Sequence, residues 1–407
     1  MTTAHPVPGD AGFAVEVLRS PAELAAIAGP WDALATATPT PFLTSAWVLA
    51  WWRAAHRPVR CVLLRDMDGR LRAGATVQEL PGRGVRGAAD VHSGDWGVVA
   101  ADPVARNAAW RQLARLARPV ARLRLPALDE SAAGGARDAL EPLGFHLVEL
   151  DRLESPALAL PASYDELLAG VSRNLRSQLG RSRRALEREG QLALRTVAER
   201  HTFAADLERF LRLEAAGWKG RQGTAVLASE RTARLYRDFA QTAFADGRLR
   251  LLLLELDGVL VAGDLSCRVG QRTALLKTAY AEARAVQRPG LVLRGEALRA
   301  ALEDGSTEYD FLGGPDSYKT RWGGELRPRR ELLAVRGPWR LEAAYRERWR
   351  PTLGKLRRRW FAGPDRPPLA PLELDHRRGA GEDGGRSERH RPAQQRPLGP
   401  QQHRSRS

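Results

Sequence analysis

The sequence predicts an α/β (α+β) fold divided into two domains. A chain of 407 residues is long for a single hydrophobic core. Its hydrophobic fraction of 43%, with 11 tryptophans, is large enough to fill real cores. Patterns typical of helices and of strands alternate along both halves of the chain, as they do in mixed α/β domains.

Apolar spacing in the first half predicts three helices and four strands. The helices are expected at 44–55, 107–117 and 132–143, and the first carries Trp47, Trp51 and Trp52 near one face. The strands are expected at 59–64, 71–79, 121–125 and 145–150. A turn through Asp68-Gly69 joins the first two strands.

The second half repeats this alternation. Helices are expected at 172–188, 203–218, 229–245 and 290–303, and strands at 191–197, 249–256, 259–268, 271–280, 308–312 and near 331–335. Asp257-Gly258 between two apolar runs predicts a hairpin turn. A last basic helix, 339–361, is expected to bend or break at Pro351.

The two ends differ in composition from the rest of the chain. Residues 1–12 are polar and rich in glycine and proline, which predicts a flexible N-terminus. Residues 362–407 consist mainly of Pro, Gly, Gln, Arg and His, which predicts a disordered tail. Between them we predict an N-terminal domain over 13–160, a C-terminal domain over 161–336 and a basic C-terminal helix over 337–361.

Composition narrows the function classes. The net charge of +16 and the pI near 10.9 favour anionic partners, but acids are interleaved with the arginines, so a phosphate-bearing ligand is a less demanding partner than nucleic acid. Two cysteines imply neither a disulfide framework nor a cysteine-based zinc site, and no metal signature is present. No signal peptide is recognisable, and the longest apolar run, about 249–256, is too short to cross a bilayer. A cytoplasmic location is therefore expected.

Lysine is rare in this chain. Of 64 basic residues four are lysines (Lys219, Lys277, Lys319 and Lys355), so the other 60 are arginines. Lysine is a compact point charge on a flexible stem, whereas arginine is a planar fork that stays protonated. Each surviving lysine is therefore either kept for its chemistry or shape or retained by chance, and both explanations stay open.

The segment before the 290–303 helix has the features of an anion site. Arg288, Pro289, Gly290 and Leu291 stand where a strand gives way to a helix N-terminus. Free N–H groups and the helix dipole at such an end attract phosphate, and glycine permits close approach. An ordinary strand-to-helix turn is the alternative.

Two further residues are expected to face each other in a hairpin. If Val269-Gly270 forms its two-residue turn, Asp264 lies opposite Leu275 and diagonal to Lys277 on the same face. Such a diagonal spans about 7–8 Å between the backbones of the two strands, within reach of a long side chain. Such a pair is either a structural ion pair or a polar floor beneath a substrate.

The strand 308–312 predicts the catalytic centre. Asp310 lies near its end, just before Gly313-Gly314, and ligands meet open sheets at strand ends. Tyr318 and Lys319 follow the glycines and can close over the same crevice. A carboxylate base, a phenol that protonates the leaving group and a cation for an oxyanion would suffice for group transfer. The alternative is that Asp310 caps a turn and Tyr318 packs.

Three other positions complete the candidates. Glu214 falls on the inward stripe of its helix with Trp218, where burial would raise the pKa of the carboxyl and suit it as a base; a hydrogen-bonded core glutamate is the alternative. Arg176 lies beside the apolar stripe of the 172–188 helix and can reach an anionic ligand, although a solvated face is the default. The loop 92–96, with His92, is interpreted as the lining of a pocket.

At these residues the chain resembles the GNAT-superfamily acyltransferases associated with cellulose and exopolysaccharide synthesis, which are related to the Fem aminoacyl transferases. The resemblance spans about Phe13 to Trp360. Its most specific pieces are Pro41-Phe42-Leu43-Thr44-Ser45-Ala46-Trp47, Ser172-Arg173-Asn174-Leu175-Arg176, Glu214-Ala215-Ala216-Gly217-Trp218-Lys219, Pro289-Gly290, and Asp310-Phe311-Leu312-Gly313-Gly314 with Tyr318-Lys319.

The resemblance implies two GNAT-like domains in tandem, each a mixed central sheet flanked by helices, with the acyl donor in the second. The helix at Gly290 would correspond to the pyrophosphate-binding helix, and Arg288-Pro289-Gly290 to a reduced Gly-rich loop with fewer donors for the phosphates. The donor would be acetyl-CoA or another acyl-CoA, and no metal would be needed. An amine or hydroxyl would attack the thioester directly, without a covalent enzyme intermediate.

The expected activity is therefore acyl-CoA-dependent N- or O-acyl transfer to a sugar, an exopolysaccharide precursor or a related small acceptor. Arg176, Trp218, Lys277 and Asp264 are the expected substrate-binding residues. Two alternatives stay open: Fem-type aminoacyl transfer from charged tRNA to a peptide or peptidoglycan precursor, and a non-catalytic scaffold that contacts membrane through the 339–361 helix.

Overall fold

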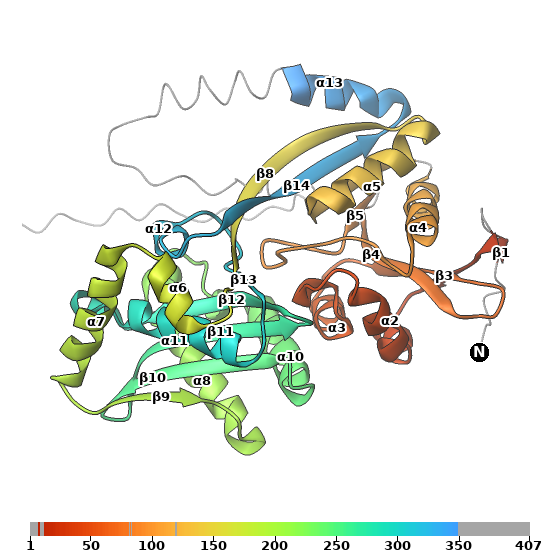
Figure 1. Cartoon of the computed structure of the whole chain (residues 1–407). Coiled ribbons are helices and arrows are strands. Elements are labelled where there is room, and N and C mark those ends of the chain that lie inside the picture. Colours follow the sequence, from red (N-terminus) through yellow and green to blue (C-terminus); the bar gives the residue numbers. More distant parts are fainter. Residues whose placement is uncertain (1–6, 9–11, 81, 83, 119, 349–407) are drawn as a thin grey trace, which may run out of the picture. The chain divides into compact units, whose positions relative to one another are not determined.

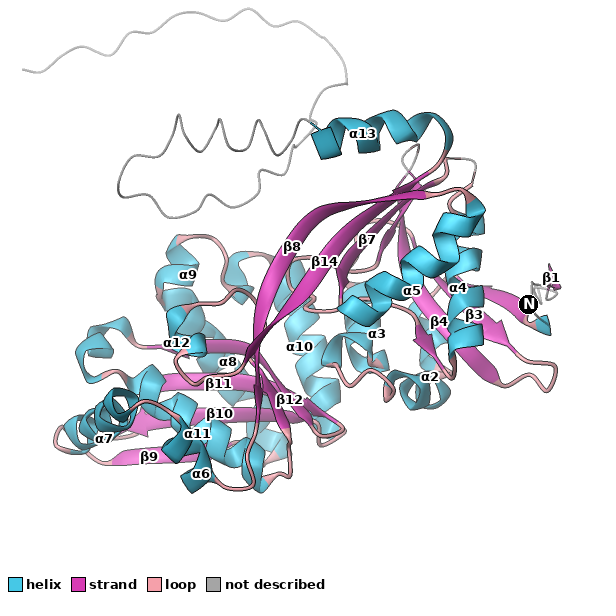
Figure 2. Ribbon diagram, turned by 45° about the horizontal axis from the view of Figure 1, so that its top comes forward, coloured by secondary structure: helices cyan, strands magenta, loops and turns pink. Residues whose placement is uncertain are grey.

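One mixed β-sheet runs through the computed structural model, which describes residues 7–8, 12–80, 82, 84–118 and 120–348 (Figures 1 and 2). Its strands lie in the order β1-β2-β3-β4-β5-β7-β14-β8-β13-β12-β11-β10-β9, with β6 paired to β4. The neighbours β5/β7 and β12/β13 are parallel and the other pairs are antiparallel. The predicted α/β class, a mixed sheet flanked by helices, is confirmed.

The first half contains the predicted helices and strands together with several short elements. Its strands are β1 (Val7–Pro8), β2 (Ala14–Leu18), β3 (Val59–Arg65), β4 (Leu71–Leu80), β5 (Gly84–Gly87), β6 (Val99–Ala100), β7 (Arg122–Leu128) and β8 (His146–Ala159). Its helices are α1 (Pro21–Ala25), α2 (Ala28–Ala35), α3 (Ser45–Arg53), α4 (Pro103–Leu116) and α5 (Glu130–Leu140), with short 3-10 turns η2 (Pro41–Leu43) and η3 (Glu141–Leu143).

The second half is close to its prediction. Its strands are β9 (Leu192–Thr196), β10 (Leu249–Leu256), β11 (Val259–Val269), β12 (Arg272–Tyr280), β13 (Glu308–Asp310) and β14 (Glu325–Val335). Its helices are α6 (Tyr164–Gly170), α7 (Arg173–Glu187), α8 (Arg200–Ala216), α9 (Trp218–Arg221), α10 (Glu230–Ala245), α11 (Pro289–Glu303), α12 (Ser317–Thr320) and α13 (Arg340–Arg348), with 3-10 turns η4 (Val226–Ala228), η5 (Glu282–Gln287) and η6 (Gly337–Trp339).

Several predictions reach beyond the described residues. The helix expected over 339–361 is seen as η6 and α13 up to Arg348, and its remainder with Pro351 lies outside the described residues. Most of the N-terminal segment 1–12 and the whole of the tail 362–407 also lie outside them. The domain boundary at residue 160 stays a prediction, because contacts do not divide the described residues at that point.

Short polar side chains begin most of the longer helices. The side-chain oxygens of Thr44, Asp102, Asp129, Ser172 and Ser229 each accept a backbone N–H from the first turn of the helix that follows. Such caps satisfy donors that have no partner inside the helix and are each worth about 1 kcal/mol. The local sequence therefore fixes where these helices start.

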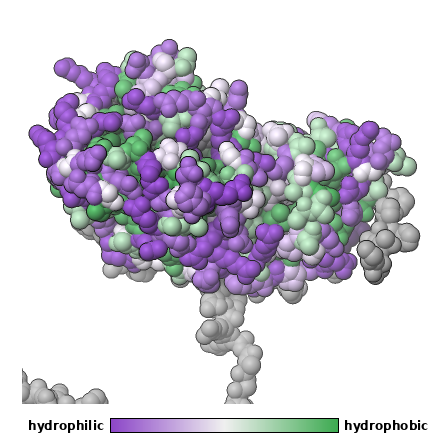
Figure 3. Space-filling model, turned by 90° about the horizontal axis from the view of Figure 1, so that it is seen from below, coloured by the Kyte–Doolittle hydropathy of each residue, from purple (hydrophilic) through white to green (hydrophobic). Residues whose placement is uncertain are grey.

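A continuous hydrophobic core joins the two halves. Trp47 of α3 packs edge-on against Tyr236 and Phe239 of α10, with ring centroids 5.8 and 5.0 Å apart. This cluster also includes Phe210 of α8, while α7 and α11 cover the opposite face of the same sheet around Leu186 and Leu293. On the face seen in Figure 3, hydrophilic side chains surround smaller apolar patches.

The long strands β8 and β14 connect the sheet's two halves. They pair antiparallel from Glu325–Ala157 to Val335–His146, and the far end of β8 pairs with β13. The sequence predicted the first third of β8 and the last half of β14. Charged residues such as Arg152 and Arg330 interrupt the apolar alternation where the strands continue, and in the structure these side chains form ion pairs instead of packing.

The predicted register of the β11/β12 hairpin is wrong. Leu265 lies opposite Lys277 and Ser266 lies opposite Leu275, so Leu276 is an extra residue in β12. The turn is Gly270-Gln271 and not the predicted Val269-Gly270, since Val269 pairs with Arg272. This turn and the β-bulge together place Asp264 opposite Thr278. Because neighbouring side chains alternate between faces, Asp264 and Lys277 point to opposite sides of the sheet.

Candidate active site

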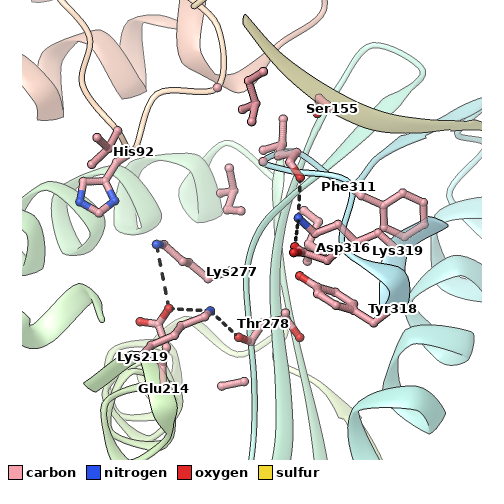
Figure 4. Close-up of a pocket in the computed structure, with 18 of the residues that line it drawn as sticks. His92, Ser155, Glu214, Lys219, Lys277, Thr278, Phe311, Asp316, Tyr318 and Lys319 are labelled. Atoms are coloured by element: carbon pink, nitrogen blue, oxygen red, sulfur yellow. Dashed lines mark hydrogen bonds and ion pairs between the residues drawn. The ribbon is translucent and has the colours of Figure 1, made fainter. Parts of the chain in front are cut away.

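A cavity of ≈ 870 Å³ opens beside β12 and is lined by most of the candidate catalytic and binding residues (Figure 4). Its walls come from β12, from α8 and α9, from the segment 311–322, and from the first-half residues Phe42 and 90–94. A volume of this size accommodates a small substrate together with the reactive end of a second one. The loop at His92, interpreted from sequence as a pocket lining, does line this cavity.

The sheet splits where the cavity begins. β12 pairs with β11 as far as Tyr280, whereas its parallel pairing with β13 covers only Arg272 to Ala274. The chain then leaves the sheet through Leu312 and Gly313, whose φ angles are 51° and 60°. Residues 275–280 of β12 therefore line the cavity with one edge that no described strand covers.

Glu214 and two lysines occupy one wall (Figure 4). Glu214 is 2% exposed, which confirms its inward position. Its Oε1 accepts a hydrogen bond from Lys219 Nζ at 3.1 Å, and its Oε2 accepts one from the Val226 N–H at 2.9 Å. Lys219 Nζ also donates to the Thr278 carbonyl at 2.8 Å. Lys277 Nζ lies 4.0 Å from the same Glu214 oxygen and 5.1 Å from the centre of the Tyr236 ring.

Trp218 does not share the inward position of Glu214. It was predicted on the same stripe but is 46% exposed at the mouth of the cavity. The reason is that α8 ends at Ala216, and Gly217, with φ −87° and ψ −166°, turns the chain before Trp218. The helix therefore ends two residues before Trp218, so the helical periodicity used in the prediction does not apply to this side chain.

Burial disfavours the charged forms of two side chains on this wall, those of Lys277 and His92. Burial lowers the pKa of the Lys277 ammonium, with Glu214 opposing the shift and Lys219 adding to it. Burial also lowers the pKa of His92 to about 4, and the nearby Lys277 lowers it further in the same direction. His92 is therefore neutral at pH 7, with its ring 5.7 Å from that of Tyr236.

The lowered pKa of His92 predicts that the folded protein becomes less stable at acidic pH. Because the folded pKa of His92 lies below the usual value of 6.5, the unfolded chain binds a proton more readily between pH 6.5 and 4, so stability should fall as the pH drops through that window. Between pH 7.5 and 5 the loss due to this residue is about 2 kcal/mol. Urea unfolding of the wild type and His92→Gln at both pH values measures it. The variant should lack this component, and equal pH dependence in both proteins would refute the assignment.

The opposite wall is the turn 312–319. Lys319 is 5% exposed, and its ammonium donates to the carbonyls of Leu312 at 2.8 Å and Gly314 at 3.0 Å. It also pairs with Asp316 at 3.0 Å. An ammonium has three N–H groups, and all three are used to hold this turn. The geometry therefore favours a structural role for Lys319 over the predicted oxyanion contact.

Tyr318 is free to meet a ligand. Its side chain is 42% exposed and lines the cavity, and its hydroxyl makes no hydrogen bond with a described residue. Burial of the hydroxyl raises the pKa of Tyr318 to about 12, with Arg294 opposing the shift. The phenol therefore stays protonated at neutral and moderately alkaline pH and can donate a proton.

Asp310 lies behind the cavity and does not line it, contrary to the prediction. It is 0% exposed and forms ion pairs with Arg272 and, at 3.5 Å, with Arg329. Its Oδ1 accepts hydrogen bonds from the Leu312 N–H at 2.8 Å and from the Ser155 hydroxyl at 3.4 Å. The strand end is thus closed by arginines, which sequence alternation along one strand cannot reveal.

The predicted anion site at α11 is present in part. Arg288, Gly290 and Leu291 line the cavity, and Pro289 does not. Pro289 has no N–H to offer, and the N–H groups of Leu291 and Val292 donate to the Arg288 carbonyl at 3.0 and 3.4 Å. Few backbone donors at this helix end are therefore available to a phosphate. The Arg288 guanidinium donates to Gln178 at 2.7 Å.

Two predicted substrate-binding residues lie away from the cavity. Arg176 donates to the carbonyls of Leu168, Ala169 and Val171 at 2.7–3.0 Å, and so closes the C-terminal end of α6. Asp264 is 1% exposed and pairs with Arg294 at 2.8 Å on the α11 side of the sheet. Arg176 is an exposed residue bonded to backbone carbonyls, Asp264 is a buried ion-pair partner, and neither lines the cavity.

Among the described residues no group of His, Cys, Asp and Glu side chains is arranged to hold a metal ion. In the same part of the chain, no helix combines the length and apolar character needed to span a bilayer.

Comparisons with known proteins indicate the class of protein to which this chain is similar. Residues 173–320 match a domain family described as an acetyltransferase (GNAT) domain. No curated protein matches the sequence. Among solved structures, the chain is similar to FemX, with 14% identity, coverage of 81% of this chain and 100% of that one, and a TM-score of 0.55.

A second similar structure is the C-terminal domain of a putative lysylphosphatidylglycerol synthetase from Agrobacterium fabrum, with 13% identity, coverage of 80% and 95%, and a TM-score of 0.52. A third is a conserved protein of unknown function from Bacteroides thetaiotaomicron, with 12% identity, coverage of 78% and 98%, and a TM-score of 0.50. At such identities the structural likeness shows the fold alone, while the matched domain supports an acyltransferase activity. The chain is an acyltransferase that contains a GNAT-type domain.

Proposed function

We propose that this protein transfers an acyl group from an acyl-CoA thioester directly to an amine or hydroxyl of a saccharide, a polysaccharide precursor or a related small acceptor. The observation that carries the proposal is the uncovered edge of β12, which opens into the cavity where the sheet splits. An exposed strand edge presents unpaired N–H and C=O groups to an extended ligand. The pantetheine arm of coenzyme A is such a ligand, because it is extended and carries two amide groups.

The residues at α11 fit the diphosphate of coenzyme A less completely than the edge of β12 fits its pantetheine arm. Arg288 supplies a positive charge, and Gly290 lets a ligand approach the helix end, where an added Cβ would lie 3.4 Å from the Tyr280 ring. The scarcity of free backbone donors means that the diphosphate would be held mainly by the arginine side chain. Free coenzyme A should therefore bind with modest affinity, and the thioester end should contribute much of the specificity.

The proposed chemistry is a single displacement. The acceptor nitrogen or oxygen forms a bond to the thioester carbonyl carbon, the carbon–sulfur bond breaks, and the thiolate leaves. We assign the proton released by the acceptor to His92, a neutral imidazole in the cavity, which passes it on to solvent because its pKa of about 4 is too low to retain it at pH 7. We assign protonation of the thiolate to Tyr318, whose phenol faces the same space. Glu214 then organises the lysines, since both of its oxygens already accept hydrogen bonds.

One observation favours a second donor, a charged tRNA. Arg173, Arg181, Arg184 and Arg188 are exposed on one side of α7, and none pairs with a carboxylate among the described residues. Such a stripe, next to the Gln178–Arg288 contact at the cavity mouth, can follow a phosphate backbone. FemX and the lysylphosphatidylglycerol synthetase domain, whose folds this chain shares, are the relatives that motivate this alternative.

Thermal unfolding with each donor separates the two proposals. Acetyl-CoA and longer acyl-CoAs should raise the melting temperature, because a ligand at 100 times its Kd stabilises the native state by about 2.7 kcal/mol. Aminoacylated tRNA should have little effect at 200 mM salt, where phosphate-driven contacts are strongly weakened. If no acyl-CoA binds and the charged tRNA binds at that salt concentration, the thioester donor is refuted and the tRNA donor is supported.

A further inference from the structure

We infer that the acceptor carries an anionic group, a carboxylate or a phosphate, and that Lys277 is the cation that binds it on the α8 side of the cavity. The inference rests on the proposed function, since it describes the acceptor of that reaction. The observations that support it concern charge balance, hydrogen bonding and the position of Lys277 relative to the donor.

The charges on this wall do not cancel. Lys219 and Lys277 share a single carboxylate, that of Glu214. Asp90, the other carboxylate that acts on Lys277, is paired with Arg231 at 2.7 Å. His92 is neutral at pH 7, because its pKa is lowered to about 4. One positive charge is therefore left without a counter-ion in a half-enclosed space.

Lys277 is the group that carries this surplus. The ammonium of Lys219 is fixed by the Glu214 carboxylate and the Thr278 carbonyl. Lys277 Nζ makes no hydrogen bond with any described residue; it lies 4.0 Å from Glu214 and over the face of Tyr236. Its side chain is 14% exposed, and that exposed part opens into the cavity, as Figure 4 shows.

An ammonium that shares its counter-ion and makes no hydrogen bond is costly in such a place unless a ligand supplies an acceptor. Transfer of a charge out of water without hydrogen-bond partners is strongly unfavourable, and the lowered pKa of Lys277 has this burial as its main cause. Around Lys277 the wall holds the neutral Tyr236 and His92 rings and the carboxylate of Glu214, which Lys219 already pairs with, so the charge of Lys277 is only partly balanced. An anionic oxygen in the cavity would supply both a counter-charge and a hydrogen-bond acceptor.

The position of Lys277 assigns the anion to the acceptor and not to the donor. Lys277 faces α8 and α10, whereas its sheet neighbour Asp264 faces Arg294 of α11. The donor phosphates are proposed at Arg288, before α11. Lys277 therefore lies across β12 from the donor's charged end and beside the proposed base His92, where the acceptor must enter.

Lysine labelling tests anion binding without any donor. The chain has only four lysines, so mass spectrometry can follow each one after limited acetic anhydride treatment of the full-length protein. At equal ionic strength, inorganic phosphate or acetate should slow the labelling of Lys277 several-fold relative to sodium chloride. Labelling of Lys355 is the internal reference. Equal Lys277 labelling rates in all three salts would overturn the inference, whatever the donor proves to be.

Turnover with matched amino sugars tests the acceptor class and distinguishes the two anions. With acetyl-CoA as donor, kcat/KM should be roughly 10- to 100-fold higher for glucosamine 6-phosphate, for muramic acid or for both than for glucosamine, as expected for one charge-assisted hydrogen bond. Lys277→Gln should remove this preference, and Lys277→Arg should restore part of it.

Arg53→Gln is the matched control, because Arg53 is an exposed arginine outside the cavity lining and its substitution changes the net charge by the same amount. It should leave the preference intact. If Lys277→Gln lowers kcat equally for charged and uncharged acceptors, Lys277 acts in the chemical step and the inference fails, although the acyltransferase assignment stands. If acetyl-CoA gives no turnover and no binding heat, the proposed function fails while the labelling result still decides whether Lys277 binds anions.

Discussion

Asp310→Asn is expected to lower the free energy of unfolding by about 3–5 kcal/mol, the usual cost of removing one partner from a buried ion pair. Asp310 is fully buried between Arg272 and Arg329, and Arg329 is itself 6% exposed. Asparagine keeps the shape and can still accept the Leu312 N–H, but it leaves two arginines with less negative charge around them. Urea unfolding at pH 7.5 measures the change.

Asp68→Asn is the control for this experiment. Asp68 pairs with Arg70 at 3.2 Å, and both side chains are more than 70% exposed. Loss of such a surface pair should change stability by less than about 1 kcal/mol. If Asp310→Asn instead unfolds like the wild type and loses acyl transfer, the carboxylate acts in the reaction, as the sequence predicted.

Asp310 illustrates what the sequence can and cannot supply. Alternation within 308–312 correctly indicated a strand before two glycines, although β13 ends at Asp310, two residues earlier than predicted. The partners of the carboxylate come from elsewhere in the chain: Arg272 from β12 and Arg329 from β14. Nothing in the sequence spacing of these residues predicts that three strands bring them together. Without its arginine partners in view, the Asp310 carboxylate was interpreted as a catalytic base.

The elements that were predicted well depend on local periodicity. Helix α10 and strand β10 agree with prediction to within a residue, because their apolar residues recur at one period along a single segment. The burial of Glu214 followed from the same argument. The bulge at Leu276 and the full length of β8 depend on what the neighbouring strand does, and one segment alone carries no record of that.

The cavity wall formed by the first half was the least predictable part of the site. His92 lies in a loop with no periodicity, and its relation to Lys277 depends on how α3 packs on α10. The rarity of lysine was the most useful signal. Lys219, Lys277 and Lys319 all line the cavity; Lys219 and Lys277 share the Glu214 carboxylate, and Lys319 holds the 312–319 turn. A compact ammonium reaches such partners where an arginine fork would collide with them.

Tyr318→Phe is expected to lower kcat by about 10²–10⁴-fold, the range typical of losing a positioned general acid. The fold should be unaffected, since the hydroxyl bonds to no described residue and Tyr318 is 42% exposed. The Kd for acetyl-CoA should also be unchanged. Initial rates of thiol release, with calorimetry for donor binding, measure both quantities.

A change of leaving group separates proton donation from simple packing. An acetyl thioester of an aromatic thiol releases a thiolate that is already stable at pH 7.5 and needs no proton. Tyr318→Phe should therefore transfer acyl groups from this donor at close to the wild-type rate, because the step that requires the phenol has been removed. An equal loss with both thioesters would mean that Tyr318 positions the substrates, and the proton for the leaving sulfur would then have to come from water.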